Sequence, residues 1–255
     1  MNIKNIATLI FCGLAFSNIA NADLITLTDP ETGQGLEAGQ TTPAAPLGNS
    51  AWSATTFGNA GAYSEYYLYW DTDPSTTEYY LGDLISLSFD TLKNSGVNDF
   101  FIQIYTTVDG NHDGSGWYGQ RLTFDPLYAN NINAPANNWN TWSTLAGTNQ
   151  LNVYDHQNYG GYAAPTLAQL LDGSYVDDPF YTFDDIDYSR EAIRGITIKT
   201  GSAWGTTFSG SIDNVNFDFG NKGQLQFDLE ANSVPEPAML VLFSLGLIGL
   251  RRKLR

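Results

Sequence analysis

The sequence is poor in cysteine, in basic residues and in long apolar runs, and each shortage argues against a class of protein. Its one cysteine, Cys12, has no second cysteine with which to form an intrachain disulfide. Lysine and arginine number 11 against 27 aspartate and glutamate residues, and the resulting net charge of −16 disfavours binding to nucleic acid. The motifs of serine hydrolases, zinc proteases and phosphate-binding loops are missing as well.

The N-terminus has the three parts of a cleavable secretion signal. Lys4 supplies a positive charge, residues 6–16 form a short apolar stretch, and the small-residue pattern Ala20-Asn21-Ala22 follows. Cleavage by signal peptidase after Ala22 would start the mature chain at Asp23. The alternative interpretation is a buried N-terminal helix of a cytosolic protein.

The C-terminus has a second apolar segment. Pro235-Glu236-Pro237 precedes residues 238–250, which are almost wholly apolar, and a basic cluster begins at Arg251 and Arg252. The prolines block a helix from running in from the preceding domain, and the basic residues stay on the cytoplasmic side of a membrane. A helix over this segment would reach only about 20 Å, short of the roughly 30 Å hydrocarbon core. The tail therefore fits a transient membrane segment better than a permanent anchor.

This tail resembles the PEP-CTERM sorting signal of Gram-negative bacteria, in which a Pro-Glu-Pro motif, an apolar helix and an arginine cluster are recognised by the membrane protease exosortase. Pro235, Glu236, Pro237, Arg251 and Arg252 carry the resemblance. It implies a precursor held transiently in the inner membrane, processing by exosortase, and a final place at the cell surface or in the extracellular matrix of bacteria that make exopolysaccharide and biofilm. Because such a signal is removed, it carries no information about the fold of the rest.

Residues 23–233 remain between the two signals and are long enough for one large domain. Apolar and polar residues alternate along 84–90, with Ile85, Leu87 and Phe89 on one face. Further strands are predicted at 24–27, 63–70, 99–108, 116–124, 138–145, 151–154, 196–199, 215–219 and 224–229. A loop is predicted at 28–56, and one short helix at 166–172 with Gly173 past its end.

These patterns predict an all-β fold, a two-sheet antiparallel sandwich of jelly-roll type with one short helix. An N-terminal signal helix and a short apolar C-terminal helix would flank it. The segment Gly210-Ser211-Ile212-Asp213-Asn214-Val215 resembles the closing strand of extracellular jelly-roll modules, including carbohydrate-binding ones.

One loop has a spacing typical of calcium ligands. Asp109, Asn111 and Asp113 place oxygen-bearing side chains at alternate positions, and Gly114 closes the turn. Gln120 stands at the twelfth position, where a calcium loop of this kind normally has a bidentate glutamate. The alternatives are therefore a bound Ca²⁺ ion and a hairpin turn whose side chains hydrogen-bond their own backbone.

Four aromatic residues are candidates for glycan binding. Trp117 and Tyr118 follow the predicted calcium loop, and Trp139 and Trp142 lie in or beside a stretch rich in asparagine. Exposed rings can stack on the C–H face of a sugar while asparagine and aspartate side chains bind its hydroxyls. The alternative is that these rings pack in the core of a β protein rich in aromatic residues.

Together these features predict an exported, non-enzymatic protein of the cell surface or exopolysaccharide matrix. Glycan binding is the hypothesis for what it does there. A polysaccharide-processing hydrolase is the alternative, and it requires two carboxylates that face each other across a cleft. A structural matrix protein without a ligand is the third interpretation.

Overall fold

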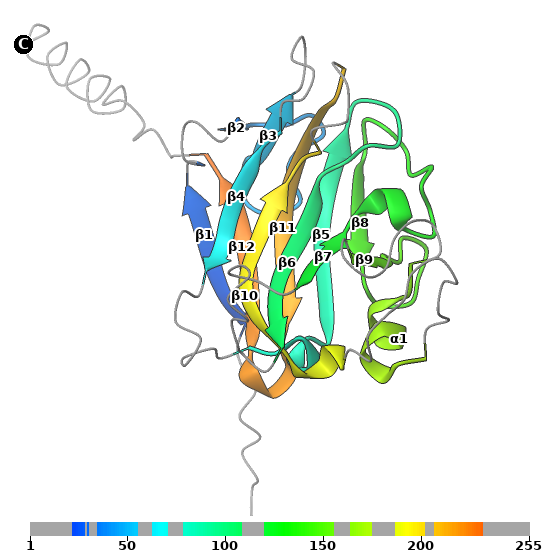
Figure 1. Cartoon of the computed structure of the whole chain (residues 1–255). Helices are drawn as coiled ribbons and strands as arrows, with labels where there is room; N and C mark the ends of the chain where they lie inside the picture. Colours follow the sequence, from blue (N-terminus) through cyan, green and yellow to red (C-terminus); the bar gives the residue numbers. More distant parts are fainter. Residues whose placement is uncertain are drawn as a thin grey trace, which may run out of the picture.

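The protein is built from twelve strands in the part of the chain that the structure describes. The computed structural model describes residues 22–28, 30, 35–55, 63–70, 79–108, 120–155, 164–174, 187–201 and 207–231 (Figure 1). One sheet has seven strands: β1 (Ala22–Thr28), β2 (Leu36–Gly39), β3 (Ala51–Thr55), β5 (Ser86–Lys93), β8 (Trp139–Ser143), β11 (Ser209–Asp218) and β12 (Gln224–Glu230). The other has five: β4 (Glu65–Trp70), β6 (Phe101–Val108), β7 (Gln120–Phe124), β9 (Val153–Asp155) and β10 (Glu191–Lys199).

The five-stranded sheet is antiparallel throughout, in the order β4-β10-β6-β7-β9. In the seven-stranded sheet β11 is central. On one edge it pairs with β5 from Gly210 to Asp218, with a shift of register between Asp213 and Asn216. On the other edge it pairs with β3 in its first half and with β12 in its second. At the outside of this sheet, β1 pairs with β12 in parallel, whereas the other pairs are antiparallel.

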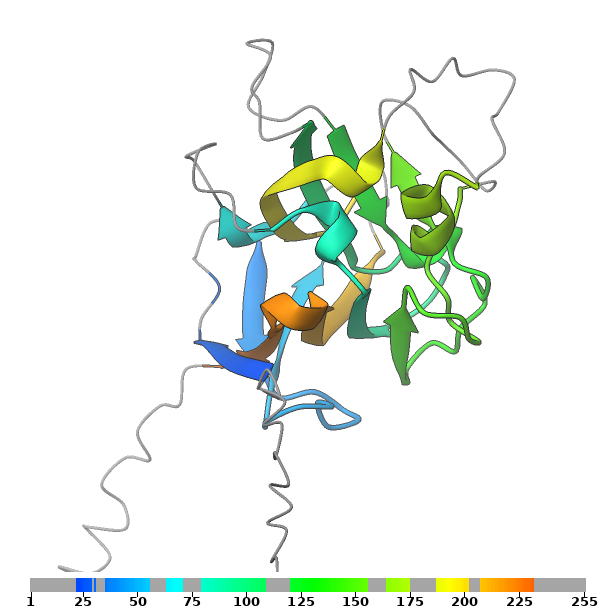
Figure 2. The same ribbon diagram turned by 90° about the horizontal axis from the view of Figure 1, so that it is seen from below.

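The two sheets face each other and enclose one apolar core (Figure 2). Leu87 and Phe89 of β5 point inward from one sheet, and Ile102 and Ile104 of β6 point inward from the other. Since successive side chains of a strand point to opposite faces, the residues between these positions form the outer faces of the sandwich. Trp52 and Trp142 are the largest fully buried side chains.

Short helices lie at the ends of the sandwich, and most of them gather at the lower end in Figure 1. The α-helix α1 (Leu167–Asp172) begins after Thr166, whose hydroxyl accepts a hydrogen bond from the Gln169 amide, and it ends at the left-handed Gly173. Four single-turn 3-10 helices complete the described elements: η2 (Leu81–Asp83), η3 (Pro126–Tyr128), η4 (Tyr188–Arg190) and η5 (Gly220–Lys222). Within the described ranges, none of the helices has the length and apolarity that crossing a bilayer requires.

The predicted all-β sandwich with one short helix is confirmed, with three corrections. The parallel β1–β12 pair departs from the predicted antiparallel arrangement. The predicted loop at 28–56 contains β2 and β3, whose small residues give little periodic signal. Ile85 lies before β5 and is 58% exposed, so it does not share the buried face of Leu87 and Phe89. The predicted flanking helices lie outside the described residues.

Candidate functional site

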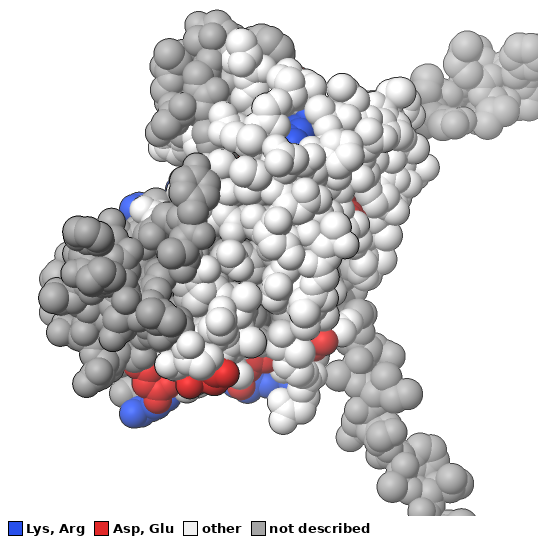
Figure 3. Space-filling view, turned by 90° about the vertical axis from the view of Figure 1, so that its right-hand side faces the viewer, with Lys and Arg blue, Asp and Glu red and all other residues white. Residues whose placement is uncertain are grey.

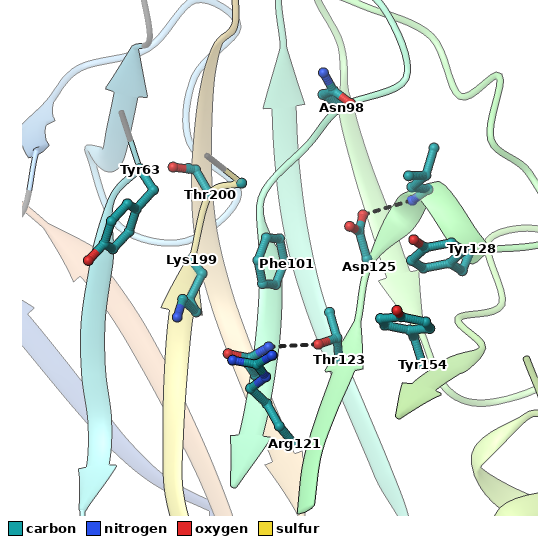
Figure 4. Close-up of a pocket in the computed structure, with 13 residues that line it drawn as sticks. Tyr63, Asn98, Phe101, Arg121, Thr123, Asp125, Tyr128, Tyr154, Lys199 and Thr200 are labelled. Atoms are coloured by element: carbon teal, nitrogen blue, oxygen red, sulfur yellow. Dashed lines mark hydrogen bonds between the residues drawn. The ribbon is translucent and has the colours of Figure 1, made fainter. Parts of the chain in front are cut away.

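An open groove of about 520 Å³ lies on the outer face of the five-stranded sheet (Figure 4). Successive side chains of β6 and β7 point alternately into the core and outward, and outward ones line the groove. Ile102 and Leu122 point into the core, whereas Phe101 and Gln103 of β6 and Thr123 of β7 line the groove. Tyr154 of β9 and Lys199 at the end of β10 also line it, so four of the five strands contribute residues, and Tyr63 lies just before the fifth, β4.

Aromatic rings form the two ends of the groove. Tyr63, 57% exposed, lies beside β4 at one end. Tyr128 and Tyr154 lie at the other, with their rings stacked at a centroid distance of 5.1 Å (Figure 4). The sheet order places four strand-to-strand spacings between β4 and β9, or roughly 19 Å at about 4.8 Å each. This length suits an extended ligand that crosses the strands.

The position of Tyr128 is fixed by the end of β7. Asp125 caps the 3-10 helix η3, its carboxylate accepting a hydrogen bond of 2.9 Å from the Leu127 amide, and Pro126 occupies the first helical position. The chain therefore turns immediately after the strand. This turn brings Tyr128 onto the ring of Tyr154, which β9 holds beside Thr123 of β7.

A chain of polar contacts holds the floor of the groove rigid. The Gln103 amide donates to the Thr123 hydroxyl at 2.8 Å and accepts from the Tyr105 hydroxyl at 2.8 Å. Lys199 lies 3.3 Å from the same tyrosine oxygen and forms an ion pair of 2.6 Å with Glu65. These contacts link four neighbouring strands, so the outward side chains are held before any ligand arrives.

Acidic groups lie in and beneath the floor. Burial, and to a lesser extent the nearby Asp99 carboxylate, raise the pKa of Asp125 to about 7 against the effect of the Leu127 amide. Asp99 is itself fully buried, and burial raises its pKa to about 7 although Lys93 lies 3.9 Å away. Lys93, 1% exposed, reaches this pair from β5 of the opposite sheet. At neutral pH, therefore, Asp125 carries only part of its negative charge.

The outer face of the seven-stranded sheet differs from that of the five-stranded sheet because the segment 40–50 is hydrogen-bonded to part of it. Asp213 of β11 accepts a hydrogen bond of 2.9 Å from the Leu47 amide. Glu230 of β12 binds the Asn49 amide and the Ser50 hydroxyl. Gly48 has a φ of 64° and is packed so closely that a Cβ atom would lie 1.6 Å from a Glu230 oxygen. These two carboxylates therefore bind the protein's own backbone and side chains.

The structure does not bring the four predicted ring residues together. Trp142 is fully buried and donates its indole N–H to the Thr91 hydroxyl at 2.7 Å, so its prediction as a ligand-binding ring is wrong. Trp139 is half-buried on the outer face of the other sheet, where its indole N–H donates to the Pro43 carbonyl at 3.1 Å. Trp117 and Tyr118 lie outside the described residues, and their role stays a prediction.

The predicted calcium ligands Asp109, Asn111 and Asp113 also lie outside the described residues. Elsewhere, in the described ranges, His, Cys, Asp and Glu side chains form no group of three that could hold a metal ion. The predicted cleavage after Ala22 falls at the first residue of β1, and Ala20 is not described.

Sequence reasoning missed the groove residues, although one signal was available. Phe101, Gln103 and Tyr105 occupy alternate positions between buried isoleucines, and Arg121, Thr123 and Asp125 do the same beside Leu122 and Phe124. Two neighbouring strands with polar and aromatic outward positions indicate a functional face. Their pairing could not be read from the sequence, because it depends on the order of strands in the sheet.

Comparison with known families identifies the tail. Residues 233–255 match the PEP-CTERM protein-sorting motif. This chain carries a PEP-CTERM signal. All five predicted motif residues, from Pro235 to Arg252, lie inside the matched range. The motif identifies an exported protein whose precursor has a membrane-anchored stage and is processed by exosortase. Neither the comparison with curated proteins nor that with solved structures gave a match.

Proposed function

We propose that the exported domain binds an extended glycan in the groove of its five-stranded sheet and is thereby retained at the cell surface or in an exopolysaccharide matrix. The observation that carries this proposal is the groove, about 520 Å³ in volume, with aromatic rings at both ends and amide, hydroxyl and charged groups between them. The PEP-CTERM signal supports the extracellular setting.

The chemistry of the lining suits a sugar chain. The exposed ring of Tyr63 and the Tyr128–Tyr154 pair offer apolar surface for the C–H faces of two separated sugar units. Between them, Asn98, Thr123 and Thr200 offer hydrogen-bonding groups for hydroxyls. Because the polar floor is already held by contacts between strands, binding would order few side chains.

A hydrolase is the competing function, and the spacing of carboxylates favours binding over it. Of the described lining residues, only Asp125 carries a carboxylate. Glu65 lies on β4, three strand spacings from Asp125 at the end of β7, or roughly 14 Å. Retaining and inverting glycosidases hold their carboxyl groups roughly 5 to 10 Å apart. Binding of Ca²⁺ by the loop at Asp109 is a separate proposal, on which glycan binding in the groove does not depend.

Calorimetric titration of the mature domain with the exopolysaccharide of the producing bacterium tests the proposal. Tyr63→Ala should weaken binding by about tenfold, equal to about 1.4 kcal/mol, because it removes the most exposed ring of the groove.

Tyr80→Ala is the matched control, since Tyr80 is also exposed but pairs with Ala192, seven residues along β10 from Lys199. No heat with any polysaccharide at millimolar sugar, or equal losses in the two variants, would sink the proposal.

A further inference from the structure

A second, smaller pocket lies on the outer face of the seven-stranded sheet, on the side of the sandwich away from the groove. It holds about 140 Å³, and outward-facing residues of three neighbouring strands build its floor. These are Ser53 of β3, Ser211 of β11 and Leu92 of β5, and the two serines each lie next to core residues of their own strands. Pockets for drug-sized ligands hold roughly 300 to 1,000 Å³, so this pocket suits a smaller ligand.

The strand register continues this floor into a row across the sheet. Ser211 pairs with Ser53 on one side and with Leu92 on the other. Beyond Ser53 the row reaches the exposed Glu37 of β2, which is its partner in register. Beyond Leu92 it reaches the half-buried Trp139 of β8. The row therefore begins with a carboxylate, continues with two hydroxyl groups and an aliphatic side chain, and ends with an indole ring.

The two serines keep hydrogen-bonding capacity for a ligand. Their Oγ atoms lie 2.7 Å apart, and this contact uses one of the two hydroxyl hydrogens. The other hydrogen and the remaining lone pairs can bind a ligand in the pocket. Ser211 is only 7% exposed, and the pairing of β3 with β11 fixes the backbone beneath both hydroxyls, so the pair is in place before a ligand arrives.

Asn137 and Thr42, both exposed, form the rim of the pocket. Asn137 stands just before β8 with a φ of 58°, and its backbone N–H donates to the Lys93 carbonyl at 2.7 Å. The indole N–H of Trp139 donates to the Pro43 carbonyl at 3.1 Å, which fixes the chain next to Thr42. The rim thus adds a side-chain amide and a further hydroxyl to the polar groups of the floor.

Lys93 also belongs to the described lining, but its ammonium group lies between the sheets. The residue is 1% exposed, and its Nζ atom lies 3.9 Å from the Oδ2 atom of Asp99. The described surface on the side that carries β8 is mostly uncharged, and charged side chains gather along its lower edge (Figure 3). The pocket is at the far end of β5 from Asp83, whose ion pair with Lys222 belongs to that edge. What these residues offer a ligand is therefore hydrogen bonding together with apolar contact.

We infer that this pocket binds one uncharged sugar unit in its pyranose form. Hydroxyl groups of the sugar donate to the Glu37 carboxylate and form hydrogen bonds with the two serine hydroxyls and the Asn137 amide. The C–H face of the sugar ring contacts Leu92 and Trp139. The pocket is a second site, beyond the function proposed for the groove, and its ligand does not depend on what the groove binds.

The experiment is an NMR titration of the isotopically labelled mature domain with the methyl glycosides of glucose, galactose and mannose at millimolar concentrations. At least one of the three should shift the backbone amide signals of Ser53, Ser211 and Asn137 until they saturate. Asn137→Gly deletes the side-chain amide at a φ of 58° that glycine readily adopts, and it should weaken this binding by about fivefold, as the loss of one hydrogen bond. Ser211→Ala should weaken it by a similar factor.

Asn138→Ala is the matched control, because Asn138 is the neighbouring exposed asparagine and donates to the Ala136 carbonyl at 3.1 Å, outside the pocket lining. Glycerol at the same concentrations controls for an unspecific polyol. Asn138→Ala and the groove variant Tyr63→Ala should both bind the sugar as the wild type does. Should Ser211→Ala not fold, Asn137→Gly at its exposed turn still decides.

An absence of shifts at these amides with all three sugars, equal shifts with glycerol, or unchanged affinity in Asn137→Gly and Ser211→Ala would overturn this inference. Each of these results leaves the proposal for the groove standing, because that proposal is tested with a polysaccharide and with Tyr63→Ala.

Discussion

Glu191 provides a direct test of how burial sets stability in this protein. It is fully buried at the start of β10, the Thr106 hydroxyl donates to its Oε2 atom, and its Oε1 atom has no hydrogen-bond partner. Burial, and to a lesser extent the charge of Asp155, raise the pKa of this carboxyl from 4.5 to about 8 against the effect of the Thr106 hydrogen bond. Between pH 5 and 7, therefore, the folded protein keeps this proton while the unfolded chain has lost it.

The sign of the pH dependence follows. The contribution of Glu191 to stability is complete below the unfolded pKa and is lost as pH rises toward the folded pKa. The free energy of unfolding should fall by about 1.4 kcal/mol per pH unit from this group alone, or by about 3 kcal/mol from pH 5 to pH 7. Asp99, Asp125 and Asp213 act in the same direction, because burial raises the pKa of each to about 7.

Glu191→Gln removes this one titration with little change of shape. Urea unfolding, followed by tryptophan fluorescence at pH 5, 6 and 7, should show a shallower pH dependence in the variant, with the gap between the two proteins changing by about 3 kcal/mol. The measured quantity is the slope of the unfolding free energy against pH. The cost of burying the new amide is the same at every pH, so it shifts this free energy by a constant and leaves the slope unchanged. Glu37→Gln, an exposed residue of β2, controls for net charge. Parallel curves for wild type and Glu191→Gln would refute the reasoning.

Three further outcomes are expected. Trp142→Phe should lower the free energy of unfolding by about 2 kcal/mol in urea titrations, because a buried indole hydrogen bond and part of the ring volume are lost. Gly48→Ala should cost about 2 kcal/mol or more in the same assay, since a Cβ atom collides with Glu230, and adding Glu230→Ala should not deepen the loss by its full separate cost. Replacing both Pro235 and Pro237 by alanine should leave the tail on the precursor, seen by mass spectrometry as C-terminal peptides in the membrane fraction; a normally trimmed product would contradict the role of the motif.

The sequence predicted those strands whose apolar residues alternate or form a dense run. The strand around Leu87 and Phe89 was expected from its alternation and the strand at 99–108 from its run of aromatic and β-branched residues, and both contribute to the core. β3 was missed because Ala51 and Ala54 are buried but too small to mark a strand by hydrophobicity.

The predicted binding rings failed for one physical reason, and the observed groove was not predicted for another. Trp139 and Trp142 are three residues apart in one strand, and an odd spacing places side chains on opposite faces, so they could not form one binding surface. The groove joins residues from Tyr63 to Gly201, and only the strand order β4-β10-β6-β7-β9 brings them together. Local patterns carry no information about such pairings.

The parallel pairing of β1 with β12 determines where the two ends of the domain lie relative to each other in the precursor. Parallel neighbours start at the same pole of the sandwich, so Ala22 lies beside Gln224 while Glu230 lies beside Thr28, roughly 20 Å away. If signal peptidase cuts after Ala22, as the sequence predicts, the new N-terminus lies at the end of the sandwich opposite to the end from which the tail leaves. From Ala231 to Ala238 the chain can stretch over no more than about 25 Å, so in the membrane-anchored precursor the domain stays within about that distance of the apolar tail segment.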